Sequence, residues 1–137
     1  EASPRRAMHL PPGFHTVTPY FFARGAERLV QFLVEGLGGT EVLRHLQGDR
    51  IANAQVRLGD CTVMVSEASI AYPARPASTY LYVADADAAM QRALAAGARE
   101  VMAVADMPYG DRQGGVRDAH GNLWWISQRT VHAPYTA

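Results

Sequence analysis

The sequence is poor in cysteine, has no net charge and contains no long apolar run, and each shortage excludes a class of protein. A single cysteine, Cys61, cannot form an internal disulfide, so we expect a reducing compartment, the cytoplasm. The 13 basic and 13 acidic side chains cancel, which removes the basic surface expected of a protein that binds nucleic acid or anionic membranes. There is no run of about 18 apolar residues that could form a membrane-spanning helix. Neither nucleic acid nor a membrane is therefore expected as a partner.

The composition is that of one globular domain. Hydrophobic residues make up 48% of the 137 residues and charged residues 19%, a balance typical of chains that bury an apolar core. Residues 1–14 have no apolar signal core, and we expect them to be flexible. Residues 15–129 are expected to form the domain, and residues 130–137 a C-terminal tail.

An internal repeat divides this domain into two halves. The tripeptide GDR at residues 48–50 recurs at residues 110–112, and TPYFFA at residues 18–23 resembles STYLYV at residues 78–83. Both matches have an offset near 60 residues, which is the signature of a duplicated structural unit. We expect module one at residues 16–68, a proline-rich linker at 69–77 and module two at 78–129.

Each module shows the same order of patterns: one strand, one helix and three strands. Residues 16–24 and 78–85 are rich in Thr, Tyr, Phe and Val, as strands are, and apolar residues recur with a helical period in residues 25–39 and 85–98. The sequence therefore predicts an α+β domain of two βαβββ modules, whose curved mixed sheets surround a cleft. The remaining strands are expected at residues 40–47, 50–58 and 61–68 in module one, and at 99–106, 112–118 and 123–129 in module two.

The alternation of side chains gives each strand two different faces. In the last strand, Trp124 and Ile126 would point to the helices, whereas Trp125 and Ser127 would point away from them. Faces of the second kind combine aromatic rings with hydroxyls, which suits a small-molecule cleft, although the same residues could be core or a dimer contact. The predicted ligand-binding residues are Tyr20, Phe22, Met64, Tyr80, Tyr82 and Trp125 as walls, Thr18, Ser66, Ser78 and Ser127 as polar groups, and Arg112 near the rim.

The paired modules and the closing segment YGDRQGGVRDAHGNLWWIS, residues 109–127, resemble the vicinal-oxygen-chelate superfamily of glyoxalase I, extradiol dioxygenases and bleomycin-resistance proteins. The segment is similar to that of PhnB-like and glyoxalase-like members, in which G-D-R, D-P-x-G and a Trp-bearing strand follow one another. Ala119 and His120 depart from the usual Pro and the common Phe. The resemblance covers residues 15–129 and implies the βαβββ fold and a homodimer that covers the clefts. It leaves the reaction open, because one scaffold carries lyases, isomerases, dioxygenases and plain binders.

The resemblance also implies where a metal would be held. Metal-dependent members use His, Gln or Glu at positions that correspond here to Thr18, Met64, Ser78 and Trp125, and hydroxyl, thioether and indole groups are poor ligands for a divalent ion. We therefore expect no metal and no other cofactor, and predict a metal-free protein that binds an organic, aromatic or antibiotic-like ligand. The alternatives are a metal-dependent lyase or dioxygenase that uses another set, such as His15, Glu67 and His120, and a scaffold protein whose own side chains fill the cleft.

A few further residues could carry chemistry. Glu67 is the carboxylate nearest to the expected cleft and is the candidate catalytic base. His120 lies in the sequence DAHGN, whose Asp, Gly and Asn favour a turn, so we expect turn chemistry there. Asp111 and Arg112 recur as Asp49 and Arg50, which indicates a structural role shared by both modules.

Overall fold

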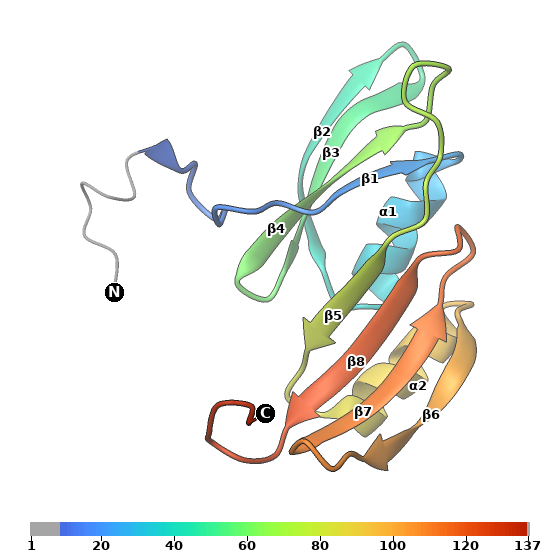
Figure 1. Ribbon diagram of the computed structural model, residues 1–137. Coiled ribbons are helices and arrows are strands. Elements are labelled where there is room, and N and C mark those ends of the chain that lie inside the picture. Colours follow the sequence, from blue (N-terminus) through green and yellow to red (C-terminus); the bar gives the residue numbers. More distant parts are fainter. Residues whose placement is uncertain (1–8, 137) are drawn as a thin grey trace.

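The computed structural model describes residues 9–136 as two modules, each of one helix and four strands (Figure 1). The α+β class and the order β-α-β-β-β are confirmed in both halves. Residues 1–8 of the predicted flexible segment and residue 137 of the predicted tail lie outside the described residues. Module one contains β1 (Tyr20–Ala23), α1 (Ala26–Glu35), β2 (Thr40–Gln47), β3 (Arg50–Leu58) and β4 (Cys61–Glu67). Module two contains β5 (Ser78–Tyr82), α2 (Ala86–Ala95), β6 (Arg99–Asp106), β7 (Asp111–Arg117) and β8 (Leu123–Arg129).

Each module forms its own four-stranded sheet, in which the first and last strands of the module pair in parallel. The strand order is β1-β4-β3-β2 in module one and β5-β8-β7-β6 in module two. Tyr20 is paired with Met64 across the first sheet, and Tyr80 is paired with Trp125 across the second. Because Tyr20 and Tyr80 are equivalent in the repeat, the matching register confirms the internal duplication.

The first strand is shorter than predicted and begins at Tyr20. Pro19 precedes it and has no backbone N–H, so it can only contribute its carbonyl, which accepts a hydrogen bond of 3.0 Å from the Met64 N–H. Thr18 therefore lies just outside the strand, half-buried, rather than on a cleft face set by strand alternation.

The two helices begin with different caps. Asp85 caps α2, since its side chain accepts a hydrogen bond of 3.1 Å from the Ala88 N–H. Gly25 precedes α1 with a φ of 76° and has no side chain to serve as a cap. The cap of α1 must therefore come from elsewhere in the fold. Among the described residues, neither helix is long and apolar enough to cross a membrane.

A single hydrophobic core joins the two modules. Trp124 and Ile126 are fully buried, which confirms that they face the helices. The Trp124 ring lies 5.5 Å from the ring of Phe21, a residue of β1 in the other module. Arg92 of α2 donates hydrogen bonds of 2.7 and 3.3 Å to the carbonyls of Glu35 and Val34 at the end of α1. These contacts hold the modules one beside the other, with each helix against its own sheet (Figure 1).

Candidate ligand-binding site

Each sheet presents a face that points away from its helix and carries aromatic rings with hydroxyl groups. In module one, the Tyr20 hydroxyl lies 2.7 Å from the Ser66 hydroxyl, which in turn donates to the Ala52 carbonyl at 2.7 Å. In module two, the Ser127 hydroxyl lies 3.4 Å from the hydroxyl of Tyr80. The same Tyr and Ser pair therefore occurs on both sheets, on the faces that the alternation of side chains predicts.

The aromatic rings on these faces form two separate groups. Tyr20 stacks on Phe22 at a centroid distance of 4.7 Å, and Phe22 stacks on Tyr72 of the linker at 5.6 Å. On the second sheet, Tyr80 and Tyr82 lie 5.2 Å apart with tilted planes. Four of these rings remain open to solvent, with exposed fractions of 45% for Tyr20, 63% for Tyr72, 41% for Tyr80 and 56% for Tyr82.

Four of the predicted cleft residues line hollows, and these four divide between two hollows rather than lining one. Tyr20 and Phe22 line a hollow of about 370 Å³ that the linker residues Tyr72, Pro73 and Arg75 complete. Tyr80 and Tyr82 line another of about 420 Å³, which runs between β5 and the start of β4 and also contacts Cys61. The two hollows share no lining residue. The linker, predicted as a spacer, thus forms part of a wall.

Trp125 owes its position to a glycine on the neighbouring strand. Gly115 is paired with Trp125, and a Cβ atom at Gly115 would lie 2.9 Å from the indole ring. The missing side chain leaves room for the ring to lie across β7. Trp125 is half-buried there, which fits the predicted aromatic wall.

The strongest polar feature of the second sheet is a buried carboxylate, Asp111, whose side chain is fully shielded from solvent. Its oxygens accept hydrogen bonds from Tyr80 at 2.8 Å, Ser127 at 3.0 Å, Arg129 at 3.0 Å and Tyr135 at 2.5 Å. Burial alone would raise the pKa of the Asp111 carboxyl, but these hydrogen bonds together hold that pKa below its ordinary value. The group is therefore an anion at neutral pH, and the bond to it raises the pKa of the Tyr135 phenol.

Tyr80 and Ser127 were predicted ligand-binding residues, but Asp111, Arg129 and Tyr135 were not. β7 begins at Asp111, one residue earlier than predicted, and its register with β8 places Asp111, Gln113 and Gly115 on the face of Tyr80 and Trp125. Extending the alternation of β8 from Ser127 by two residues would have placed Arg129 on this face as well. Tyr135 carries no such signal, because it belongs to the tail.

Arg112 does not lie at the rim of this face, which corrects the prediction for that residue. It is next to Asp111 in the strand and therefore points to the opposite side, where its guanidinium donates to Asp87 of α2 at 2.8 and 3.0 Å and to Asp106 at 3.1 Å. Its counterpart Arg50 instead donates to the carbonyls of Glu67 and Ala68, so the twin residues do not share a structural role.

Glu67, the candidate base, supplies the missing cap of α1. Its two carboxylate oxygens accept hydrogen bonds of 3.0 and 2.9 Å from the N–H groups of Gly25 and Ala26. Gln128 holds the corresponding place in module two and accepts 2.9 Å from the Ala86 N–H. A carboxylate whose two oxygens bind a helix N-terminus is occupied with stabilising that helix, so a catalytic role for Glu67 finds no support in the geometry.

His120 lies in a turn, as predicted, and Asp118 organises that turn. The buried Asp118 carboxylate accepts hydrogen bonds from the His120 and Asn122 N–H groups and, at 2.9 Å, from the indole N–H of Trp124. The His120 ring reaches across to module one, where Nε2 lies 3.2 Å from the Gly25 carbonyl. The DAHGN turn therefore positions Trp124 through the Asp118 carboxylate.

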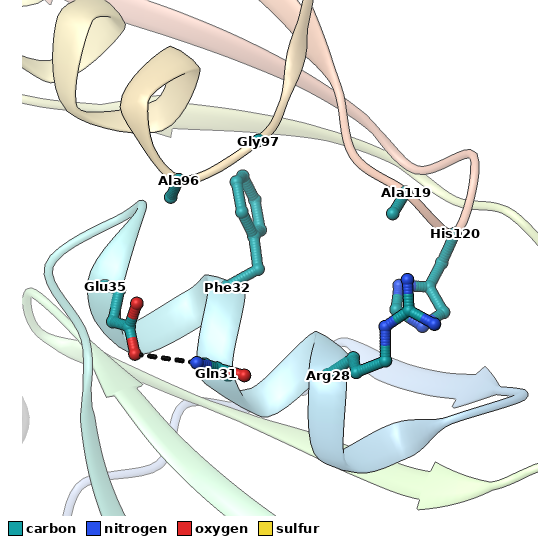
Figure 2. Close-up of a pocket in the computed structure, with 8 residues that line it drawn as sticks. All are labelled: Arg28, Gln31, Phe32, Glu35, Ala96, Gly97, Ala119 and His120. Carbon is teal, nitrogen blue, oxygen red and sulfur yellow. Dashed lines mark hydrogen bonds between the residues drawn. The ribbon is translucent and has the colours of Figure 1, made fainter.

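The His120 ring also closes a hollow between the two helices (Figure 2). In Figure 2, Arg28 and Phe32 of α1 lie on one side, and Ala119 and Gly97 on the other. This hollow of about 320 Å³ is lined by residues from the helix side of the fold, so it is distinct from the aromatic faces.

The three residues named for a metal-dependent enzyme do not form one ligand set, although Glu67 and His120 both contact the backbone of Gly25. His15 lies at the start of β4, with Nε2 2.8 Å from the Asp60 carbonyl, whereas Glu67 is at the opposite end of that strand. His15, Asp60 and Cys61 place three potential ligand atoms within 4.8 Å of one another, but His15 and Asp60 are exposed. At the positions implied by the resemblance, Thr18, Met64, Ser78 and Trp125 offer a donor set that does not fit a divalent metal.

Comparisons with known proteins agree with this fold. The chain is 30% identical over 124 residues to an uncharacterised protein of Mycobacterium bovis, with 82% of each chain covered. The crystal structure of TioX from Micromonospora sp. ML1 superimposes with a TM-score of 0.69 at 30% identity, covering 82% of this chain and 95% of that one. The structure of TnmS3, an antibiotic binding protein from Streptomyces sp. CB03234, superimposes with a TM-score of 0.66 at 20% identity, covering 84% and 97%.

A family model matches nearly the whole domain, over residues 13–126. This match spans both modules as far as Ile126, and includes the Tyr20 and Ser66 pair and the DAHGN turn. The chain belongs to the Glyoxalase/Bleomycin resistance protein/Dioxygenase superfamily.

Proposed function

We propose that this protein binds a small organic molecule, without a metal, on the aromatic faces of its two sheets. The observation that carries this proposal is the second sheet, where open tyrosine rings surround a buried, ionised Asp111. Apolar walls with a few fixed polar groups are the usual composition of a small-molecule site. Aromatic rings favour planar guests by stacking, so an aromatic or antibiotic-like compound is the expected ligand.

The comparisons support the class of ligand. TnmS3 is described as an antibiotic binding protein and has the same fold. Because one superfamily scaffold hosts both binders and enzymes, the argument for binding rests on the donor set and on the sheet faces. The candidate base Glu67 caps a helix, and His15 lies at the opposite end of β4 from Glu67, so His15, Glu67 and His120 do not form one site.

We further propose that the protein forms a homodimer. The open tyrosines and the exposed residues Val42, Leu43 and Leu46 of β2 leave apolar surface that a second copy could cover. Sedimentation velocity would test this, and a monomer at micromolar concentration would contradict it.

A cytoplasmic location is also proposed, and it rests on the single Cys61, whose thiol has a pKa raised by burial and by Asp60.

Titration of tryptophan fluorescence tests ligand binding directly. Trp125 lies on the proposed site and Trp124 lies in the core, so each can report separately. We expect planar aromatic compounds to quench the wild-type protein, and the response to disappear in Trp125→Phe while Trp124 remains. Absence of quenching by every compound of a panel of naphthalene, quinoline, anthraquinone and glycopeptide compounds would refute the proposal.

Elemental analysis of protein purified without chelators tests the metal-free state. We expect substoichiometric Zn, Ni, Mn and Fe. Stoichiometric metal that survives in His15→Ala would overturn the metal-free proposal, because such an ion would be held away from the exposed group of His15, Asp60 and Cys61.

A further inference from the structure

The C-terminal tail does not leave the domain but turns back onto the second sheet. After β8, the guanidinium of Arg129 donates to the Ala133 carbonyl at 3.2 and 2.7 Å, which folds residues 130–136 toward the strand ends (Figure 1). The Arg129 guanidinium also lies 4.1 Å from the centroid of the Tyr135 ring. The tail thus brings one aromatic ring to the face that the proposed function assigns to a ligand.

The hydroxyl group of Tyr135 holds this residue on the face of the second sheet. Its hydroxyl donates to the Asp111 carboxylate at 2.5 Å and lies 2.7 Å from the hydroxyl of Tyr82. Its ring is flanked by the Arg129 cation and by the ring of Tyr109, at a centroid distance of 6.4 Å, and remains 48% exposed. Tyr135 is therefore held by the Asp111 anion at its hydroxyl, by the Arg129 cation at its ring, and by the phenols of Tyr82 and Tyr109.

The other donors to Asp111 belong to the strands of the second sheet. Tyr80 and Ser127 already donate to the same oxygen that Tyr135 contacts, and Arg129 donates to the other. These donors come from β5 and β8, which the sheet holds in place. If the Tyr135 ring left, a preformed acceptor and a cation would remain, next to space the size of a phenol.

We propose that this place is a subsite for the phenol group of a ligand, and that Tyr135 is its intramolecular occupant in the free protein. This inference rests on the proposed function and names its ligand class: a hydroxyl-bearing aromatic ring. A phenol can donate to the Asp111 carboxylate while Arg129 attracts its ring. A methyl ether has no proton to donate, and an aromatic carboxylate would be repelled by the anion.

The tail must then compete with the ligand. A short tether gives Tyr135 an effective concentration in the millimolar range, and a site that is mostly occupied binds an external ligand more weakly in proportion. Removal of the Tyr135 ring should therefore tighten phenol binding. Removal of its hydroxyl alone should have a smaller effect in the same direction.

Three matched probes on four proteins test the inference. The probes are 2-naphthol, 2-methoxynaphthalene and 2-naphthoate, and the proteins are the wild type, Tyr135→Phe, Tyr135→Ala and the control Tyr72→Ala, which lies on the other sheet. Affinity is measured by calorimetry, and ¹H–¹⁵N NMR shifts locate the site. We expect 2-naphthol to bind at least about tenfold more tightly than its methyl ether. Its binding should shift the NMR signals of amides in β7, β8 and the tail. Tyr135→Ala should bind 2-naphthol roughly tenfold or more tightly than the wild type does, and Tyr72→Ala should not.

The outcomes separate this inference from the proposed function. Equal affinity for 2-naphthol and its ether, or unchanged affinity in Tyr135→Ala, would overturn the phenol subsite while leaving a general aromatic site in place. Shifts confined to β1, β4 and the linker would do the same. If no probe binds any of the four proteins and no panel compound quenches Trp125, the proposed function fails along with the inference.

Discussion

Replacement of Asp118 by alanine should destabilise the protein severely, although this residue touches no proposed ligand. Its carboxylate accepts from the buried indole N–H of Trp124 at 2.9 Å, and from the backbone N–H of Asn122 at 3.0 Å and its side-chain amide at 2.9 Å. Asn122 and Trp124 are 3% and 0% exposed, so water reaches these donors poorly. Each buried donor left without a partner costs about 1–2 kcal/mol, and three such donors sum to about 3–6 kcal/mol.

That loss is large against the total stability of a domain of this size, which is about 5–15 kcal/mol. Urea unfolding followed by circular dichroism and by Trp124 fluorescence measures it. Asp118→Asn keeps one acceptor oxygen and should lose less, and Asp49→Ala, which removes an exposed carboxylate from a turn, should change the unfolding free energy by less than about 0.5 kcal/mol. An unfolding free energy for Asp118→Ala within about 1 kcal/mol of the wild type, at unchanged m-value, would refute the reasoning.

Three further changes test other parts of the structure. Glu67→Ala removes the cap of α1 and should lower the unfolding free energy by about 1–2 kcal/mol in chemical denaturation, with ligand affinity unchanged; a parallel fall in affinity would restore Glu67 to the binding site. Gly39→Ala places a Cβ 2.7 Å from Val56 and 2.9 Å from the Leu33 carbonyl and should cost about 1–3 kcal/mol, measured by thermal unfolding; an unchanged melting temperature would contradict this packing. The pKa of Asp111 is lowered in the folded state, so its contribution to stability is present above its ordinary pKa of about 4 and is lost as the pH falls further. Urea unfolding between pH 6 and 3 should therefore show a steeper loss of unfolding free energy in the wild type than in Asp111→Asn. Equal slopes in the two proteins would argue against this role of Asp111.

The sequence predicted the fold closely because the fold depends on local patterns. Strand alternation and helical periodicity act over a few residues, and the repeat shows the same pattern twice; the predicted order of elements is found in both modules. Tyr80 and Trp125 share a face because period-two alternation is a property of any strand. The largest difference at a strand start is in β1, which begins only after Pro19, a residue without a backbone N–H.

The site was less predictable because its contacts join distant parts of the chain. Glu67 reaches the start of α1 from a strand some 40 residues away, and Tyr135 reaches Asp111 across 24 residues of strand and tail. Arg112 was placed on the wrong side because the register of β7 against β8 decides which residue of the Asp111 and Arg112 pair faces the tyrosines. Such pairings follow from how the elements pack, which no spacing in the sequence encodes.

The contacts between the modules have a consequence for folding. Arg92 of one half caps the carbonyls of α1 in the other, His120 reaches the Gly25 carbonyl, and the Phe21 and Trp124 rings pack against each other across the boundary. An isolated half would expose Trp124 or leave the end of α1 without its donors. The two copies of the ancestral unit have therefore become interdependent, and the chain should unfold in one cooperative transition, with neither half persisting once the other has melted.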